Sequence, residues 1–440
     1  MPVLSAFTGR PLPAAADVVV IGAGIQGCAA AYYLARRGLK PVLLDKSTIA
    51  GQQSGRAWGF VRIMDREAAE VPLMIEAMKI WPGLQAELQA DLEWRQDGNL
   101  FLADSDRELA HFEDWLKIAR TYGLDTRVVG PKEVAKLLPG LADPGRGGLY
   151  GPSEGHAEPR KAAAAFARRA ADLGALIFEG CGAIGLETAG GAVAGVVAEA
   201  GTIRTGIAVV CAGTSSFRIL KTLGLDLPQQ HVRATCSRTS PVAQLSGIAF
   251  FGHRMGFRQR PDGSLNIADE TSLDIDLTLG RLRALSWFLP AWLRSREPMS
   301  VVVNGAALQD LLHRLPWRPE ARQPWIHDRE PQIPPNARRV QGALDKLRRY
   351  FPAAADARIV ESWAGNIDVL PDAIPVIGPA PRPPGLILAT GYSGHGFGMG
   401  PISGRLIAEI AAAGKPSLDL GAFRFERFAE GRVQLPTQSR

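Results

Sequence analysis

Apolar runs and helix-length segments alternate at the start of the chain. Residues 18–21 form the continuous run VVVI, which is typical of a strand buried on both faces of a parallel sheet. We expect a helix over 25–37, because Gly38 suits the position just after a helix end. A second apolar run at 41–44 predicts another buried strand, which ends in Asp45. This order indicates the strand–helix–strand unit of an α/β fold with a parallel sheet.

The same pattern returns after long interruptions. The region 226–345 is different, because it is rich in proline, tryptophan and arginine and contains alternating stretches such as GSLNIAD. It therefore reads as part of a second domain. Further helices are expected at 67–90 (with one break), 159–173 and 402–413, further strands near 100–102, 148–150, 175–178, 207–211 and 386–389, and a loop at 47–62.

A glycine motif follows the first strand. Gly22, Gly24 and Gly27 have the spacing G-x-G-x-x-G, in which the second glycine lets the backbone approach a pyrophosphate and the third packs helix on strand. The N-terminus of the following helix directs N–H groups and a positive dipole at the phosphates. Asp45 is placed to accept hydrogen bonds from an adenosine ribose, and its charge would repel a 2′-phosphate. The unit predicts a dinucleotide site for FAD or NAD rather than NADP.

A second glycine-rich segment separates these two cofactors. Residues 391–401, GYSGHGFGMGP, lead from the strand at 386–389 into another helix. NAD held by one strand–helix–strand module does not need a second helix N-terminus. A flavin uses one, because negative charge develops along its N1 and C2=O when it takes a hydride. The segment favours FAD; a flexible glycine loop is the alternative.

Bulk composition narrows the class of protein. The 440 residues are 46% hydrophobic and 21% charged, as in an ordinary globular protein with a large core. The net charge of +6 is not gathered into a basic run, so we expect no nucleic-acid partner. Neither an apolar stretch of membrane-spanning length nor a signal-peptide core is found, and we expect a cytoplasmic protein.

Cysteine-pair and metal-binding motifs are missing from the sequence. The four scattered cysteines form no C-x-x-C pair and read as buried thiols in a reducing compartment. The seven histidines lack metal-binding spacing, so we expect no metal site.

Four segments resemble those of the flavoproteins typified by D-amino-acid oxidase, glycine oxidase and the sarcosine oxidase β subunit. They are the N-terminal glycine motif, SGRAWGFVR, VVCAGTSS and GYSGHGFGMGP. A further segment, SWAGNIDVLPDAIPVIGP, is similar to a branch that handles opines, N-methylated amino acids and cyclic imino acids. The resemblance extends over essentially the whole chain. It departs at Trp58, where the family usually has a small polar residue.

The resemblance implies a fold and a cofactor. The fold is α/β, with a discontinuous Rossmann-like FAD-binding domain at 1–95, 150–225 and 345–440. A substrate domain with a mixed, largely antiparallel sheet is expected at 96–149 and 226–344. The loop near Ser54 lacks the histidine or cysteine that some members use for covalent attachment, so we expect non-covalent FAD. The residues expected to hold it are Gly22, Gly24, Ile25, Gln26, Gly27, Asp45, Lys46, Gln53, Ser54, Gly55, Arg56, Ala183, Ala212, Gly213, Gly394, His395, Gly396, Phe397 and Gly398.

The implied reaction is oxidation of a C–H bond next to an amine nitrogen, by hydride transfer to flavin N5, giving an imine that hydrolyses. The substrate is a small amine or amino acid, and the electron acceptor is oxygen or a respiratory carrier. His395 is expected near the flavin, where a fixed dipole or a cation would stabilise its reduced form; a histidine that only supports the turn is the alternative. Tyr392 is a lesser candidate for the substrate face.

A substrate carboxylate calls for a cation, preferably arginine with its two-pronged geometry. Arg62, Arg254 and Arg258 are the candidates, although each of them taken singly reads more readily as a surface or structural arginine. His253, on the same expected strand as the last two, reads better as a core histidine. Asp368 could meet a substrate amine, although capping the turn before Pro371 is favoured.

Two other classes of function stay open. An NAD-dependent dehydrogenase is disfavoured by the second glycine segment. A flavin-carrying subunit that is inactive without partner subunits is not excluded.

One amphipathic segment is compatible either with contact to a membrane or with burial inside the fold. In 281–296, RLRALSWFLPAWLRSR, leucines recur at helical spacing and arginines mark both ends. Such a segment could contact an anionic membrane and pass electrons to a quinone pool. Because Pro290 would kink the helix, we expect the apolar stripe to be buried beneath the substrate-domain sheet instead.

Overall fold

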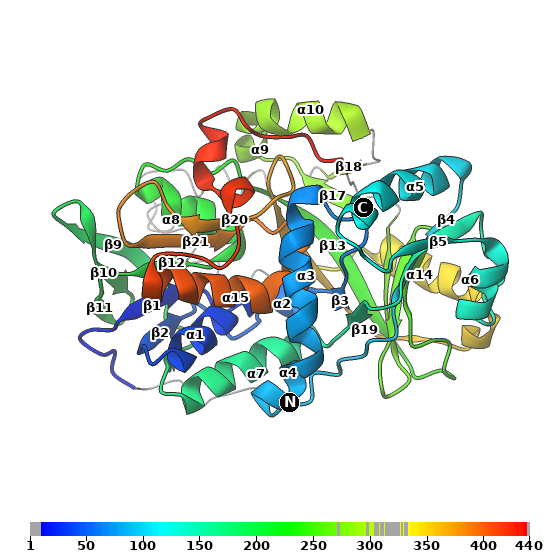
Figure 1. Ribbon diagram of the computed structural model, residues 1–440, viewed down its shortest axis with the longest axis horizontal. Helices are drawn as coiled ribbons and strands as arrows, with labels where there is room; N and C mark the ends of the chain where they lie inside the picture. Colours follow the sequence, from blue (N-terminus) through cyan, green and yellow to red (C-terminus); the bar gives the residue numbers. More distant parts are fainter. Residues whose placement is uncertain are drawn as a thin grey trace.

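The computed structural model describes residues 10–270, 273–295, 299–302, 308, 312, 326, 329 and 333–437. Two large sheets organise these residues, and Figure 1 shows them on opposite sides of the molecule. The first has six strands in the order β20-β21-β12-β1-β2-β8, and all neighbours are parallel except β20 and β21. Its strands are β1 (Val18–Ile21), β2 (Pro41–Leu44), β8 (Leu176–Phe178), β12 (Ala208–Val210), β20 (Val376–Pro379) and β21 (Leu386–Thr390).

Both faces of this parallel sheet are covered. Val18 and Val20 face a core formed with three helices, among which α1 packs against both α7 and α15 (Figure 1). Val19 and Ile21 face a second core, formed with α8 and a three-stranded antiparallel sheet. Burial on both sides explains why β1 and β2 are continuous apolar runs, as expected. The covering elements are α1 (Ile25–Arg36), α7 (Pro159–Asp172), α15 (Gly396–Ala413), α8 (Ser216–Thr222), β9 (Ala183–Ala189), β10 (Ala192–Ala198) and β11 (Gly201–Arg204).

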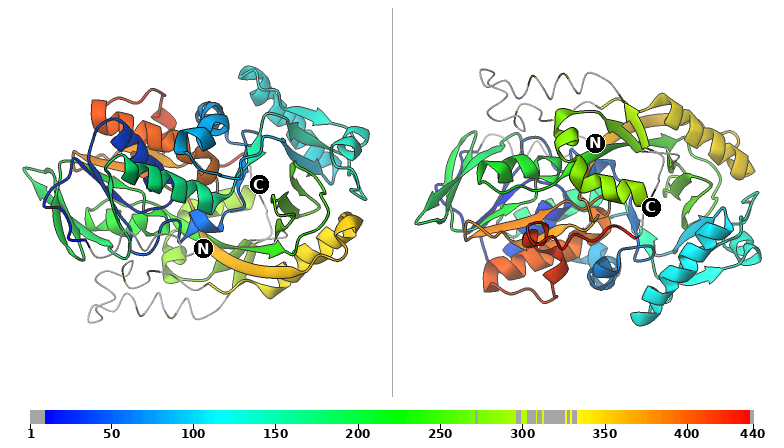
Figure 2. Two further views of the ribbon diagram at one scale, coloured as in Figure 1. Left: turned by 90° about the horizontal axis from the view of Figure 1, so that it is seen from below. Right: turned by 90° about the horizontal axis from the view of Figure 1, so that it is seen from above.

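The second sheet is mixed and largely antiparallel, as expected. Its strand order is β18-β17-β13-β16-β15-β14-β4-β6-β5, with β19 paired to β13 along most of its length. Figure 2 shows helix α14 running beside the long strand β19. The strands are β4 (Asn99–Ala103), β5 (Arg127–Val129), β6 (Gly147–Gly151), β13 (Gln230–Thr239), β14 (Ala249–Gly252), β15 (Met255–Gln259), β16 (Leu265–Asp269), β17 (Leu273–Asp276), β18 (Met299–Val302) and β19 (Ile359–Val369); the helices beside them are α5 (Asp106–Thr121), α6 (Pro131–Leu137) and α14 (Ala337–Tyr350).

Three expectations about elements differ from the structure. The expected boundary at 345 falls inside α14 and places β19 in the FAD-binding domain, whereas β19 pairs with β13 of the mixed sheet. The segment 47–62 is not a plain loop, because it contains α2 (Gln53–Arg56) and β3 (Phe60–Val61), which pairs with β7 (Gly155–His156). The last long helix begins at Gly396 rather than 402, because the glycine segment itself supplies its first turn.

Helical segments at 67–90 connect the two sheets. The expected helix with one break is found as α3 (Val71–Ile80) and α4 (Leu84–Leu88), separated by a turn at Pro82. Short 3-10 turns complete the described elements: η2 (Ala68–Glu70), η3 (Trp81–Gly83), η4 (Gly213–Ser215), η5 (Pro352–Ala354), η6 (Gly421–Phe423) and η7 (Phe425–Phe428).

The amphipathic segment is exposed, which corrects the expectation that it is buried. It forms α9 (Leu279–Arg283) and α10 (Leu285–Ser295), and Leu282, Leu285 and Leu293 are 54%, 48% and 58% exposed. The place beneath the mixed sheet belongs to α14, whose buried apolar residues pack in one core with β15 and β16. The last residue of the segment, Arg296, lies outside the described residues. Within the described part of the chain, no helix combines the length and apolar character needed to cross a membrane.

Candidate active site

A cavity of about 460 Å³ is lined by residues from both sheets. The ends of β1, β2 and β12 contribute one wall, and β13 and β19 contribute another. Of the residues expected to hold FAD, all except Gly27, Gly55 and Gly398 line it. Those three glycines have packing roles instead: a Cβ would lie 1.8 Å from the Gly22 carbonyl oxygen at Gly27, 2.1 Å from the Ala50 carbonyl oxygen at Gly55, and 3.1 Å from the Met74 Cε at Gly398.

The first glycine turn is shaped around open space. Gly22 has φ +104°, and a Cβ there would lie 2.4 Å from the carbonyl oxygen of Cys211, so only glycine fits. Gly24 has φ −69°, and among the described residues a Cβ there would meet just the Ser54 Oγ, at 3.1 Å. Asp45 accepts a 2.6 Å hydrogen bond from the backbone N–H of Ala23 and lines the cavity beside this turn. The open space before Gly24 fits a pyrophosphate that approaches the backbone.

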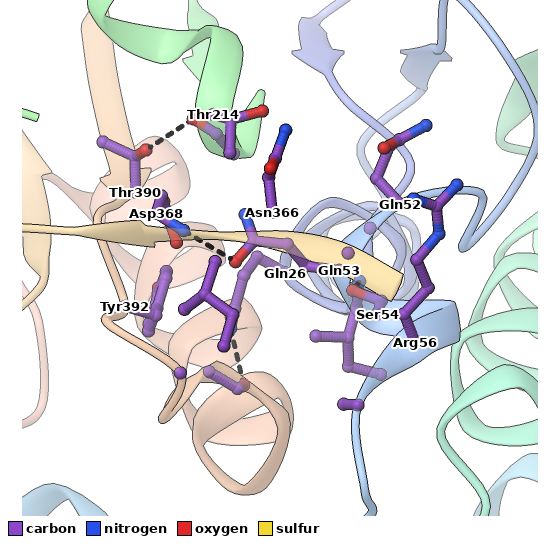
Figure 3. Close-up of a pocket in the computed structure, with 18 of the residues that line it drawn as sticks. Gln26, Gln52, Gln53, Ser54, Arg56, Thr214, Asn366, Asp368, Thr390 and Tyr392 are labelled. Carbon is purple, nitrogen blue, oxygen red and sulfur yellow. Dashed lines mark hydrogen bonds between the residues drawn. The ribbon is translucent and has the colours of Figure 1, made fainter. Parts of the chain in front are cut away.

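The N-terminus of α15 faces the same cavity. Gln26, at the start of α1, donates a hydrogen bond of 2.7 Å to the carbonyl oxygen of Gly396, which ties the two helix starts together (Figure 3). The Oε1 atom of Gln26 is buried and has no hydrogen-bond partner among the described residues. A buried amide oxygen without a partner is costly and indicates a group to be supplied by a ligand. These residues fit a flavin dinucleotide, whose pyrophosphate would be held by the N-terminus of α1 and whose ring would be met by that of α15.

His395 precedes α15 and is held from behind by a carboxylate. Its Nδ1 lies 3.0 Å from Oε2 of Glu70, which is fully buried, and Arg66 Nη1 lies 3.9 Å from the same oxygen. Burial lowers the pKa of His395 below its ordinary value, with Arg66 and Arg62 acting in the same direction against Glu70. The ring is therefore neutral near pH 7, and of the two forms expected for His395 the fixed dipole is favoured over the cation.

Arg62 is the one of the three candidate arginines that lines the cavity. Its Nη1 donates to the carbonyl oxygens of Met64 and Asp65, and its guanidinium lies 4.8 Å from the centre of the Phe101 ring. The loop that carries it is fixed by Glu154, whose Oε1 accepts hydrogen bonds from two successive backbone N–H groups. Burial raises the pKa of Glu154 to about 7.

The other two candidate arginines lie elsewhere. Arg258 is fully buried on β15, where its Nη2 lies 2.5 Å from Glu158 Oε2, so this guanidinium is already paired with a carboxylate. Arg254 is exposed at the tip of the β14–β15 hairpin, with φ +54°, and lies outside the cavity. The alternation of residues along the strand could not show that Arg258 is paired with a carboxylate, because its partner Glu158 lies 100 residues away in the sequence.

The remaining candidates divide between the cavity and the scaffold. Tyr392 lines the cavity and is buried, which raises the pKa of its hydroxyl well above the ordinary value. Asp368 accepts hydrogen bonds of 2.9 Å from Gln229 and from the backbone of Gly391, so it supports the turn that precedes α15. His253 lies 2.8 Å from Asp104 and outside the cavity, as a satisfied scaffold histidine.

Two residues at the site were missed by sequence reasoning. Arg66 lines the cavity, and its Nη1 is buried without a hydrogen-bond partner among the described residues. Glu70 contacts His395 across 325 residues of sequence. The available signal was a pair of charged residues four positions apart, just before α3.

The profile of the DAO family, FAD dependent oxidoreductase, matches residues 17–410. The chain belongs to this family. It is thus an FAD-dependent oxidoreductase, and the expected fold class and cofactor are confirmed.

Relatives of this DAO-family chain are distant. It is 24% identical to human sarcosine dehydrogenase over 97% of its own length, but spans only 43% of that protein. It is 26% identical to the sarcosine oxidase subunit beta of Rhodobacter capsulatus, covering 94% of this chain and 89% of that one. The structure of an L-amino acid deaminase from Proteus myxofaciens in complex with anthranilate superposes with a TM-score of 0.90 at 26% identity, covering 97% and 96% of the two chains.

Proposed function

We propose that the protein oxidises the C–N bond of an amino acid or of an N-substituted or cyclic amino acid, giving an imine that water hydrolyses. The observation that carries this proposal is the cavity, which joins a dinucleotide cradle to an arginine-bearing wall. Bound FAD would supply the hydride acceptor, at N5. The residues of the chain bind the carboxylate, orient the amine and exclude water.

Apolar rings line part of the cavity. Trp58 and Phe251 stack with ring centres 6.4 Å apart, and Phe101 lies between Phe251 and the guanidinium of Arg62. This arrangement suits a carboxylate held at one end and an apolar side chain or ring at the other. The names of the relatives support the same class, since they concern sarcosine and L-amino acids, and anthranilate is an aromatic amino carboxylate.

The proposal is tested by anaerobic flavin bleaching. The purified protein is mixed with L- and D-amino acids, N-methyl amino acids such as sarcosine, and cyclic amino acids such as proline. Loss of the oxidised flavin band with at least one of these compounds supports the proposal. Retention of the band with all of them, in protein with a full flavin complement, overturns it.

A second candidate is a flavin-carrying subunit that acts only with partners. Two relatives favour this candidate. One is itself a subunit, the sarcosine oxidase subunit beta, and this chain spans only 43% of the length of the other, sarcosine dehydrogenase. Anaerobic bleaching reports only the reduction of the flavin by the substrate, and not the transfer of electrons from the flavin to an acceptor. Turnover of the isolated chain with an artificial electron acceptor then separates a self-sufficient enzyme from such a subunit.

An Arg62→Met variant is expected to bind substrate about ten- to a hundredfold more weakly, because one charge-assisted contact to the carboxylate is lost. Flavin content should be unchanged, and KM should rise more than kcat falls. Arg254→Met is the matched control, since that arginine is exposed and outside the cavity. Equal KM values for the two variants would remove Arg62 from the carboxylate site.

The exposed face of α9 and α10 favours contact with an anionic membrane surface, and hence a respiratory acceptor reached from the cytoplasm. Apolar side chains on this face and arginines along the segment are the features of an interfacial helix. We expect sedimentation with phosphatidylglycerol vesicles at low salt, lost in a Leu285→Ser/Leu293→Ser variant. Leu173→Ser, at a leucine that is 40% exposed just after the end of α7, should leave it unchanged. Wild-type protein that stays in the supernatant would contradict the membrane contact.

A further inference from the structure

The carboxylate behind His395 is built into the fold. Glu70 is the last residue of η2, is 0% exposed and does not line the cavity, whereas His395 does. Both oxygens of Glu70 lie within hydrogen-bond distance of Nδ1 of His395, at 3.0 and 3.2 Å. The Nδ1 side of the ring is therefore turned into the protein, and the remaining nitrogen, Nε2, is the one available toward the cavity.

The charges around Glu70 and His395 determine which ring nitrogen of His395 carries the proton. The charged groups that face His395 are Glu70, Arg66 and Arg62, the last two from the loop after β3. Burial opposes ionisation of Glu70, but His395 and the two arginines outweigh it and hold the pKa of this carboxyl below its ordinary value. An ionised Glu70 accepts hydrogen bonds only, so Nδ1 of the neutral imidazole must donate to it. Nε2 is then unprotonated and is an acceptor.

We propose that Glu70 is a positioning residue that fixes the Nδ1–H form of His395, so that Nε2 accepts a proton from the ammonium group of the bound substrate. This inference rests on the proposed function and adds a proton-transfer step to it. Amino acids are largely ammonium ions near neutral pH, and a protonated nitrogen has no lone pair to assist departure of the hydride.

The step conserves charge and atoms. The N–H bond of the substrate breaks, its electron pair stays on the amine nitrogen, and the proton forms a new bond to Nε2. The resulting imidazolium, with N–H groups on both nitrogens, is stabilised by the carboxylate of Glu70 at Nδ1. The neutral amine is then ready to lose hydride to the bound cofactor. A buried histidine without such a carboxylate would take up the proton much less readily.

The proton position can be measured without turnover. In the holoenzyme labelled with ¹⁵N-histidine, the spectrum reports the protonation of both ring nitrogens, and the His395→Gln spectrum identifies the signals of His395 among the seven histidines. We expect a protonated Nδ1 and an unprotonated Nε2 at pH 7 to 8. In Glu70→Ala the preference for Nδ1–H should be lost. An Nε2–H form, or an imidazolium at pH 7, in the wild-type protein would overturn the proposal even if the enzyme is active.

Kinetics on an amino acid found by the bleaching screen complete the test. We expect Glu70→Ala to slow flavin reduction roughly a hundredfold at pH 7, with the rate recovering at alkaline pH, where the amine is already neutral. Glu70→Gln serves if the alanine variant does not fold. Glu67→Gln is the matched control, because this buried carboxylate of the same segment binds Thr437. A loss of rate that is equal at all pH values would show a purely structural role for Glu70.

Discussion

A Gly24→Val variant is expected to fold and to purify without FAD. Valine is compatible with the backbone of this residue, which has φ −69° and ψ 178°. Its Cβ would meet the Ser54 Oγ at 3.1 Å, so the protein itself needs little adjustment. The two methyl groups would fill the space through which the pyrophosphate must approach the N-terminus of α1. The ratio of flavin to protein absorbance should fall to background, while circular dichroism remains that of a folded α/β protein.

Gly130→Val is the control for this variant. Like Gly24 before α1, Gly130 is the residue just before a helix, α6, and has nearly the same backbone angles, φ −80° and ψ 169°. It lies outside the cavity, and its variant should keep a full flavin complement. Substitution of Gly22 or Gly27 cannot serve the same purpose, since a Cβ there collides with backbone and would disturb the fold itself. A Gly24→Val protein that retains flavin would refute the pyrophosphate assignment.

The strands that could be predicted from the sequence are those buried on both faces, because each of them is a run of consecutive apolar residues. β1, β2 and β21 are buried on both faces, so each is an apolar run that needs no knowledge of its neighbours. β19 is different, because its residues are mostly half-buried and its place is decided by pairing with β13, more than a hundred residues earlier. The pairing of β19 therefore could not be read from its own residues.

The amphipathic segment shows a second limit. The apolar stripe of α10 has the spacing of a helix that packs on a sheet, and periodicity alone does not say whether a surface is available to receive it. In the structure, α14 occupies that surface with Ala343, Leu344 and Leu347. A competing helix at a distance in sequence decided the outcome.

The residues of the candidate site also fall into two groups, those that could be predicted from consecutive residues and those that depend on a distant partner. The glycines at 22, 24 and 27 act through their own backbone, so their spacing was enough to predict them. Residues that act through a partner were not predicted: Glu70 has a role only because the fold brings it to His395. The structural role of Arg258 likewise depends on a partner distant in sequence, Glu158, which pairs with its guanidinium.

A His395→Ala variant is expected to keep FAD and to slow flavin reduction by roughly ten- to a thousandfold. FAD should be retained because Gly396 and Phe397 still begin α15 and Gln26 still bonds the Gly396 carbonyl. The rate should fall because the polar contact at the cavity wall is removed. Stopped-flow measurement of flavin reduction at saturating substrate checks this, and unchanged kinetics would reduce His395 to a support of the turn.

The pH dependence of this variant separates two reasons for a slower reaction. If His395 acts as a dipole that stabilises the reduced flavin, the deficit should be nearly the same at every pH, because that contact is lost under all conditions. If Nε2 takes the proton of the substrate ammonium, the deficit should shrink as pH rises, because more substrate arrives as the neutral amine. The lowered pKa of His395 makes the neutral ring available over the whole range in which this comparison is made. We expect the second pattern, with the largest loss near neutral pH and rates that approach the wild-type value under alkaline conditions.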